Sequence, residues 1–180
     1  MDTINKNQNE ENHKNLNAAD AENKIKDLVD KNHTCFFCTE MTSSHSQSNG
    51  VRPMSVLKVD DDGVLWFLSA NDSHKNKEIA ANHTVKLYFQ GSPHSDFLFL
   101  SGKATITQDE EIIKQLWEPV LKTWFTEGEN DPRISVIKVT PNKGYYWDTK
   151  HGAAVAGIKM LIGAAIGKTL DDSIEGKIKI

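Results

Sequence analysis

The chain has no long apolar run and no excess of positive charge, and these two absences exclude several kinds of protein. Its longest apolar stretch, residues 153–167, contains Lys159 and is too short to span a bilayer comfortably. The formal net charge of −4 gives no reason to expect nucleic acid or an anionic membrane surface as a partner. Because no apolar segment follows a basic N-terminus, we expect no secretory signal and a cytoplasmic protein.

Cysteine is also scarce, with only Cys35 and Cys38 in the whole chain. They lie in an apolar run over residues 33–41 that predicts a strand, and their odd separation places the two side chains on opposite faces of it. Extended Cα atoms three residues apart are separated by ~10 Å, too far for a disulfide. A redox CxxC motif is the alternative, but we expect two unlinked, buried thiols. Two cysteines without further ligands make a poor zinc site, and the histidines match no metal-binding spacing, so no metal site is predicted.

The first 18 residues contain almost no apolar side chain, and six of them are asparagine. Such a segment buries too little surface to offset the entropy lost on ordering, so we expect residues 1–18 to be a disordered tail. Residues 19–180 are sufficient for one domain with an adequate core. A helix is predicted at its start, over Ala19–Asn32, because the apolar residues of this segment fall on one face.

The central stretch, residues 50–82, indicates two strands joined by a tight turn and followed by a helix. Apolar residues predict strands at Ser55–Val59 and Val64–Leu68, and the Asp62–Gly63 pair between them is a strong signal for a hairpin turn. A polar Asn-Asp-Ser segment then ends the second strand and can cap a helix that starts near Lys75.

Polar and charged residues at the two ends of this unit can come together on one anion. Arg52 lies at the start of the first strand, and Ser73 and Lys75 lie just past the end of the second, at the helix N-terminus. Backbone N–H groups and the helix dipole favour negative charge there, so the three side chains are candidates for binding a phosphate. The alternative is that Arg52 and Lys75 are solvated surface charges.

Further strands are predicted over residues 84–90, 96–107, 133–140 and 177–180. Gly102, within the second of these, indicates a bulge or a close approach of two backbones. The chain therefore has six or seven short strands, mostly antiparallel, with helices between them. This pattern is typical of a mainly β, α+β domain in which a small closed barrel carries peripheral helices.

Two more helices are predicted in the second half of the chain. The first covers residues 109–125, where Pro119 should kink or interrupt it. The second covers residues 153–168 and is largely apolar. Its Gly163 and Gly167 match a GxxxG pattern, which in a short soluble helix indicates close packing rather than membrane dimerisation.

Several short motifs occur in one order along the chain: Arg-Pro-Met at 52–54, Leu-Trp-Phe-Leu-Ser at 65–69, Ser-x-Lys at 73–75 and Tyr-Tyr-Trp-Asp at 145–148. In their order and spacing the chain resembles the general stress protein 26 group of the pyridoxamine 5′-phosphate oxidase-like, FMN-binding split-barrel superfamily. The resemblance runs from about Leu28 to the C-terminus. It implies an antiparallel split β-barrel that forms a homodimer, with FMN bound at the dimer interface.

The resemblance also implies which residues hold the FMN. The three phosphate candidates keep that role, and Met54 with residues 66–69 supplies an apolar wall and backbone donors for the isoalloxazine ring. A core position is the alternative for Trp66, whereas Trp117 and Trp124 are either core residues or line a flavin edge or the subunit interface. The complete set of predicted cofactor-binding residues is Arg52, Pro53, Met54, Trp66, Phe67, Leu68, Ser69, Ser73, His74, Lys75, Trp117 and Trp124.

If the chain is an enzyme, the resemblance implies an FMN-dependent oxidoreductase that exchanges electrons with a small molecule and uses NAD(P)H as donor. The C-terminus has no Arg-Leu-x-Pro-like sequence, which argues against a true pyridoxamine 5′-phosphate oxidase. No serine or cysteine can be matched with a histidine and a carboxylate, so no catalytic residue is predicted and the flavin carries the chemistry. The alternatives are a non-catalytic flavin-binding module of the stress response and, with less support, a haem or deazaflavin binder on the same barrel.

Overall fold

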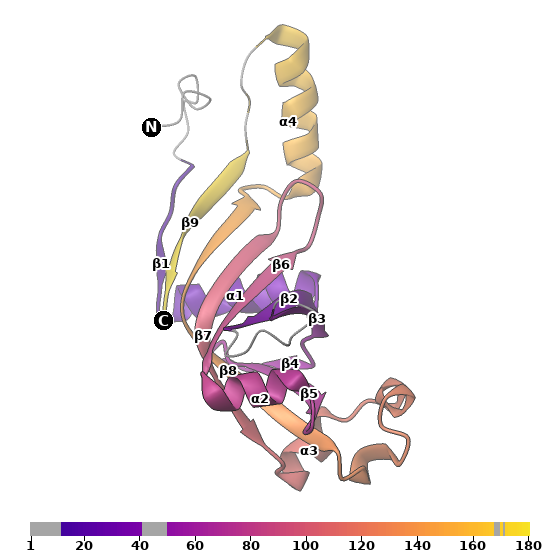
Figure 1. Cartoon of the computed structure of the whole chain (residues 1–180). Coiled ribbons are helices and arrows are strands. Elements are labelled where there is room, and N and C mark those ends of the chain that lie inside the picture. The colour runs from indigo at the N-terminus through magenta and orange to yellow at the C-terminus, as the bar shows by residue number, and fades with distance from the viewer. Residues whose placement is uncertain (1–11, 41–49, 168–169, 171) are drawn as a thin grey trace.

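The structure of the chain is a computed structural model that describes residues 12–40, 50–167, 170 and 172–180. Within these residues it has four α-helices and one nine-stranded sheet (Figure 1). The helices are α1 (Ala19–Lys31), α2 (His74–Ala81), α3 (Glu110–Leu116) and α4 (Ala153–Ile166). The strands are β1 (Leu16–Asn17), β2 (Thr34–Thr39), β3 (Val51–Ser55), β4 (Lys58–Val59), β5 (Leu65–Ala70), β6 (Thr84–Gln90), β7 (Phe97–Thr107), β8 (Ile134–Thr149) and β9 (Ser173–Lys179).

Most of the sheet closes into a barrel around the core. The longest strand, β8, pairs with β7 along most of its length and with β5 through its first half. From β7 the sheet continues through β6 and β2 to β3. The short strands β3 and β4 follow one another in the chain, and β4 pairs with β5, which closes the ring. All pairs within this ring are antiparallel, as the sequence predicted.

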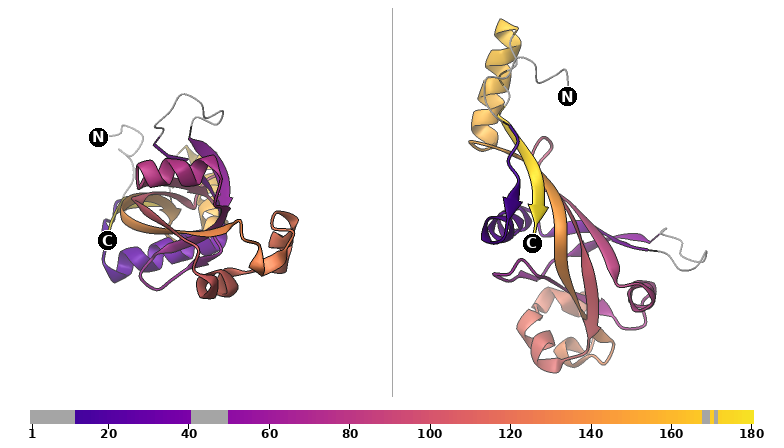
Figure 2. Two further views of the ribbon diagram at one scale, coloured as in Figure 1. Left: turned by 60° about the horizontal axis from the view of Figure 1, so that its bottom comes forward. Right: turned by 90° about the vertical axis from the view of Figure 1, so that its left-hand side faces the viewer.

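The second half of β8 extends beyond the barrel and carries two further strands. There β9 pairs antiparallel with β8, and β1 pairs parallel with β9, so the sheet has nine strands where six or seven were predicted. The helix α4, which connects β8 to β9, stands at this end of the molecule and projects away from the barrel (Figures 1 and 2).

The strand β1 lies within the segment that composition assigns to a disordered tail. Leu16 is 6% exposed and belongs to the main core, and the Tyr146 hydroxyl donates a hydrogen bond to the Lys14 carbonyl at 2.8 Å. Pairing with β9 satisfies backbone groups here although few side chains are apolar. The prediction of disorder therefore does not hold for residues 12–18, and residues 1–11 lie outside the described part of the chain.

The main core is built by α1 and the inward-facing residues of the barrel. Ile25, Leu28 and Val29 of α1 are fully buried, which confirms the helix and the face predicted for it. Phe37 of β2 and Phe67 of β5 meet edge to face, with ring centroids 5.3 Å apart. Such aromatic pairs add ~0.5–1.5 kcal/mol beyond the area that they bury.

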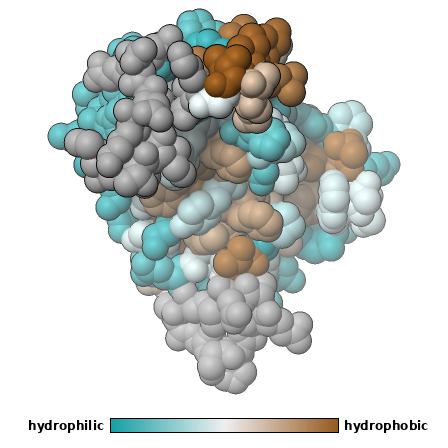
Figure 3. All heavy atoms as spheres, turned by 90° about the horizontal axis from the view of Figure 1, so that it is seen from above, coloured by the Kyte–Doolittle hydropathy of each residue, from teal (hydrophilic) through white to brown (hydrophobic). Residues whose placement is uncertain are grey.

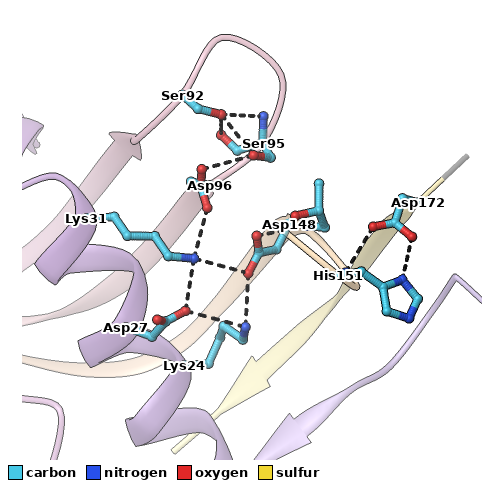
Figure 4. Close-up of polar contacts among 10 residues, drawn as sticks. Lys24, Asp27, Lys31, Ser92, Ser95, Asp96, Asp148, His151 and Asp172 are labelled. Carbon is cyan, nitrogen blue, oxygen red and sulfur yellow. Dashed lines mark hydrogen bonds and ion pairs between the residues drawn. The ribbon is translucent and has the colours of Figure 1, made fainter. Parts of the chain in front are cut away.

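Charged residues of α1 join this helix to β8 and to the loop between β6 and β7 (Figure 4). Lys24 Nζ lies 3.0 Å from Asp148 Oδ2, and Lys31 Nζ lies 3.0 Å from Asp96 Oδ1. The side chain of Asp148 is only 5% exposed, so water screens this pair less than an ordinary surface pair. The contacts hold the β6–β7 loop in place beside the second half of β8.

Two local predictions are confirmed. The β7–β8 register shifts at Gly102, where a Cβ atom would collide with the Thr140 carbonyl and would lie 2.7 Å from the Cα atom of Pro141. The long helix predicted up to residue 125 is interrupted, because α3 stops at Leu116 and a 3₁₀ turn begins at Pro119. Among the described residues, no helix is both long enough and apolar enough to cross a bilayer.

Candidate functional site

Two of the three predicted phosphate ligands, Ser73 and Lys75, lie at the N-terminus of α2, and the third, Arg52, contacts the same helix one turn further along. Ser73 caps this helix by accepting a hydrogen bond from the Asn76 N–H, which confirms the predicted cap. The Lys75 ammonium donates to the Ser69 hydroxyl at the end of β5, and the hydroxyls of Ser69 and Ser73 lie 3.2 Å apart. Arg52 reaches the same region from β3 and contacts Glu78 of α2.

The charges of this cluster favour an anion. Burial and, to a lesser extent, the nearby Arg52 guanidinium lower the pKa of Lys75 to about 8, and the Glu78 carboxylate opposes the change. Among the residues that the structure describes, the cations of Arg52 and Lys75 share their surroundings with the Glu78 carboxylate. An anion placed there would be attracted by the excess positive charge and by the dipole of α2.

Glu78 is a member of the cluster that the sequence analysis did not select. Its Oε2 atom accepts hydrogen bonds from Arg52 Nη2 at 2.7 Å and from the Thr39 hydroxyl at 2.5 Å. Arg52 Nη1 also donates to the Thr39 hydroxyl, at 2.8 Å. A signal was available, because Glu78 follows Lys75 by three residues and such residues share one face of a helix.

A second set of polar contacts fixes α2 against the barrel. Asn76 is 4% exposed and donates from Nδ2 to the Ser135 hydroxyl at 2.7 Å. Ser135 in turn donates to the Ser69 carbonyl at 2.9 Å, so β8, β5 and α2 are linked in one chain of hydrogen bonds. Every contact is between buried groups, which makes the position of the helix N-terminus well defined.

The aromatic residues predicted beside the flavin are divided between two faces of β5. Phe67 and Ser69 face the main core and the cluster, whereas Trp66 and Leu68 alternate to the other side and pack against α3. Trp117 lies in the same second apolar group. The Trp66 side chain is partly buried, its Nε1 donates to Asp60 Oδ2 at 3.3 Å, and Lys138 Nζ lies 5.2 Å from the ring centroid.

The remaining predicted residues lie outside the cluster. Trp124 is 63% exposed and His74 is exposed at the first position of α2. Met54 is partly buried against the main core. Pro53 instead lines a hollow of about 600 Å³ on the outer face of β2, β6 and β7, together with Phe36, Tyr88, Phe99 and Trp147 among others.

The two cysteines lie on opposite faces of β2, as predicted, with Cys35 buried and Cys38 partly buried. Burial raises the pKa of Cys35 to about 12, and burial also raises the pKa of Cys38. Both thiols are free. Within the described residues, no group of three histidine, cysteine, aspartate or glutamate side chains is placed to hold a metal ion.

We expect native Cys35 to resist a disulfide-exchange reagent at pH 8, because the thiolate is the reactive form and almost none is present far below its pKa. A colorimetric thiol assay on native and urea-unfolded protein tests this, and unfolding without reductant should release both thiols. Two thiols that stay undetected after unfolding until a reductant is added would mean that a disulfide links them.

Sequence comparisons match most of the chain. A family profile described as pyridoxamine 5′-phosphate oxidase like matches residues 20–171. General stress protein 26 of Bacillus subtilis (strain 168) is 24% identical over 130 residues, which cover 70% of this chain and 87% of that protein. Protein bli-3 of Neurospora crassa is 27% identical over 104 residues, which cover 53% of this chain and only 50% of the Neurospora protein.

Solved structures share the fold. A Jannaschia sp. CCS1 protein assigned to general stress protein 26 superposes with a TM-score of 0.73 at 22% identity, covering 91% of this chain and 99% of that chain. The general stress FMN/FAD binding protein of Xanthomonas citri superposes with a TM-score of 0.57 at 20% identity, covering 69% and 84%. These similarities establish the architecture of the chain.

Proposed function

The chain belongs to the pyridoxamine 5′-phosphate oxidase-like family, and from this we propose that it binds FMN with the phosphate at the Arg52–Lys75 cluster. The observation that carries the proposal is that Ser73 and Lys75 lie at the start of α2 while Arg52 binds Glu78, one turn further along the same helix. These residues come from β3 and from the start of α2, the two ends of the central stretch 50–82. The name of the Xanthomonas relative, an FMN/FAD binding protein, supports a flavin as the ligand.

The chemistry of the cluster suits a phosphate monoester. Such a group carries a charge near −2 at neutral pH, which the Arg52 guanidinium and the Lys75 ammonium can meet in part. The Ser73 hydroxyl and the N–H groups of the first turn of α2 supply neutral donors. Glu78 and Thr39 hold the guanidinium in place before any ligand arrives, so binding has less side-chain freedom to remove.

The outer face of the barrel offers a place for the flavin ring and for a second copy of the chain. Phe36 of β2, Tyr88 of β6 and Trp147 of β8 are 60%, 45% and 44% exposed, and they border the hollow described above. Exposed apolar patches of this kind mark interaction surfaces. We therefore include a homodimer in the proposal, with the isoalloxazine ring covered by both copies.

For the reaction, the proposal is an oxidoreductase in which the bound flavin exchanges a hydride with a small molecule such as a nicotinamide. The chain's own contribution is to bind and orient the cofactor through the cluster and to exclude water at the subunit contact. One absorption measurement distinguishes this oxidoreductase from a non-catalytic flavin-binding module. Only an oxidoreductase should bleach the flavin absorption on addition of NADH or NADPH.

We expect the purified protein, after incubation with FMN and desalting, to keep absorption bands near ~450 and ~375 nm. Riboflavin, which lacks the phosphate, is the matched ligand and should be lost on the same column. A protein that stays colourless would remove the flavin from the proposal, and a protein that retains riboflavin as well as FMN would remove the phosphate from the cluster.

A further inference from the structure

Lys75 has a different kind of partner from Lys159, another partly buried lysine of the chain. Lys159 Nζ lies 2.7 Å from Asp172 Oδ1, so its charge is balanced by a carboxylate. Lys75 is also partly buried, but it donates to the hydroxyl of Ser69, which is a neutral group. Among the described residues, no carboxylate forms an ion pair with Lys75. Its side chain can therefore lose its proton without leaving a buried carboxylate unpaired.

The contact with Ser69 suits a neutral amine as well as an ammonium. The Ser69 hydroxyl donates its own proton to the Ala70 carbonyl at 3.3 Å, so it accepts from Lys75. A neutral amine still has an N–H for that contact, and its lone pair then points away from Ser69. The pKa of Lys75 is about 8 through burial and the nearby Arg52 charge, so near pH 8 about half of these side chains are neutral. A desolvated lysine beside another cation is the usual form of an activated amine nucleophile.

The same amine lies beside groups that suit a phosphate. Ser73 and the N–H groups of the first turn of α2 are next to it in the chain, and Arg52 contacts the same helix one turn further along. The helix dipole and the guanidinium both favour an anion. A lysine that binds a phosphate also lies beside whatever group is bonded to that phosphate.

We propose that Lys75 is a modification site for acyl phosphates, the mixed anhydrides of a carboxylic acid and phosphate. The inference rests on the phosphate assignment made in the proposed function. In an acyl phosphate the reactive acyl carbon is separated from phosphorus by a single bridging oxygen. The cluster that binds the phosphate therefore places this carbon next to the amine, and such positioning accelerates a reaction by removing the cost of bringing the two groups together.

The reaction needs no further reagent. The lone pair of the neutral Lys75 amine attacks the acyl carbon and forms a C–N bond, and the bond from this carbon to the bridging oxygen breaks. The electron pair of the broken bond leaves with inorganic phosphate, and the nitrogen gives one of its two protons to water. The products are an amide on Lys75 and free phosphate. Arg52 and the N–H groups of α2 stabilise the negative charge of the leaving phosphate.

The modification lowers the affinity of the cluster for FMN. An amide carries no charge, so acylation removes one of the two cations that meet the FMN phosphate and leaves Arg52. FMN and an acyl phosphate also compete for the same groups, so bound FMN protects Lys75 from acylation. The fraction of the protein that carries flavin then depends on the balance between FMN and acyl phosphates.

The first test uses acetyl phosphate on the flavin-free protein at pH 8, with acetylation at each lysine followed over time by mass spectrometry. Lys75 should react faster than Lys77 by about tenfold or more. Lys77 is the matched comparison because it is exposed and lies two residues further along the same helix. Excess inorganic phosphate, which occupies the cluster without reacting, should slow the reaction at Lys75 and leave the rate at Lys77 unchanged.

Two comparisons separate recruitment by phosphate from reactivity alone. Lys159 is partly buried like Lys75, and it lies on α4, whose hydrophobic residues gather at this end of the molecule (Figure 3). Its ammonium is paired with Asp172, so acetyl phosphate should acetylate it more slowly than Lys75. The N-hydroxysuccinimide ester of acetic acid carries no phosphate, and inorganic phosphate should not change its rate of reaction with Lys75.

The second test measures the effect of acetylation on the flavin. After treatment with acetyl phosphate and desalting, the wild type should bind FMN more weakly by about tenfold or more, as expected for the loss of one cation from the phosphate. Lys75→Arg cannot form this amide, so its own FMN affinity should be the same before and after treatment. Lys77→Arg should lose affinity on treatment as the wild type does.

The outcomes separate this inference from the proposed function. Acetylation of Lys75 that is no faster than that of Lys77, or that inorganic phosphate does not slow, overturns the inference, and FMN retention by the untreated protein then leaves the proposed function standing. Selective, phosphate-sensitive acetylation in a protein that retains no FMN supports the modification site and overturns the flavin. Acetylated protein that binds FMN as tightly as before overturns the control of flavin binding.

Discussion

Replacing Arg52 with alanine is expected to lower the free energy of unfolding by about 3 kcal/mol, the low end for breaking a buried ion pair. The side chains of Arg52 and Glu78 are 15% and 10% exposed, and their charged atoms lie 2.7 Å apart. Without the guanidinium, the Glu78 carboxylate keeps its burial but loses the ion pair with Arg52. Urea unfolding of the wild type and the variant measures the difference.

Two further variants decide whether the buried charge is the cause. Adding Glu78→Gln to the Arg52→Ala variant should recover more than half of the lost stability, because the amide is neutral and still accepts from Thr39. Lys114→Ala removes the pair with Glu111, whose side chains are 45% and 79% exposed, and should cost less than about 1 kcal/mol. If Arg52→Ala cost no more than Lys114→Ala, the pair would have no special role in stability.

The same ion pair connects stability with the proposed function. Glu78 holds Arg52 in position, and it neutralises only one of the two cations because Lys75 lies in the same cluster. The described residues of this cluster thus carry an excess of positive charge beside the first turns of α2. A ligand phosphate would relieve this excess, so we expect FMN to raise the midpoint of thermal unfolding through preferential binding to the folded state.

The parts of this arrangement that local sequence encodes were predictable. The cap at Ser73 and the helix that follows it depend on residues within one turn, and the structure has both. The bulge at Gly102 is also local, since only glycine tolerates the approach of the Thr140 carbonyl. The interruption at Pro119 has the same character, because the proline ring excludes a continuous helix.

Contacts between distant segments were not predictable in the same way. Arg52 was expected near the start of the helix, but its ion-pair partner Glu78, 26 residues away, was not selected, because nothing in the pattern of α2 specifies which of its side chains faces β3. The face of β5 on which Trp66 lies could not be predicted either. The strand is apolar at nearly every position, and an apolar run does not show which residues point inward. In the structure Phe67 points into the main core, so Trp66, its neighbour in β5, points to the opposite face of the strand.

The two ends of the chain illustrate a third limit. Composition predicts disorder up to residue 18, yet β1 is ordered by a strand that comes from the other end of the chain. The apolar helix near the C-terminus was predicted, but its exposure was not, since an apolar helix in a soluble protein is normally covered by its own fold. Both features depend on what lies next to a segment in space.

Lys75→Ala is expected to weaken FMN binding by more than tenfold, about 1.4 kcal/mol, because it removes one of the two cations from the phosphate. Fluorescence quenching of FMN on titration with protein measures the affinity. Lys77→Ala is the matched control, since Lys77 is two residues further along the same helix and is exposed. Riboflavin affinity should be the same in all three proteins, and an FMN affinity unchanged by Lys75→Ala would remove this residue from the phosphate site.

The pH dependence of FMN affinity is a second, independent test of whether Lys75 binds the phosphate. Burial and the Arg52 charge hold the pKa of Lys75 at about 8 in the free protein, and a bound phosphate dianion would raise it. Below pH 8 the lysine is already charged, so binding takes up no proton there. Between pH 8 and the raised pKa, binding requires proton uptake, and FMN affinity should fall with rising pH by up to about tenfold for each pH unit. The phosphate itself has finished titrating by then, since its second pKa is about 6. In Lys75→Ala this fall should disappear, whereas a fall that persists in the variant would assign the titration to another group.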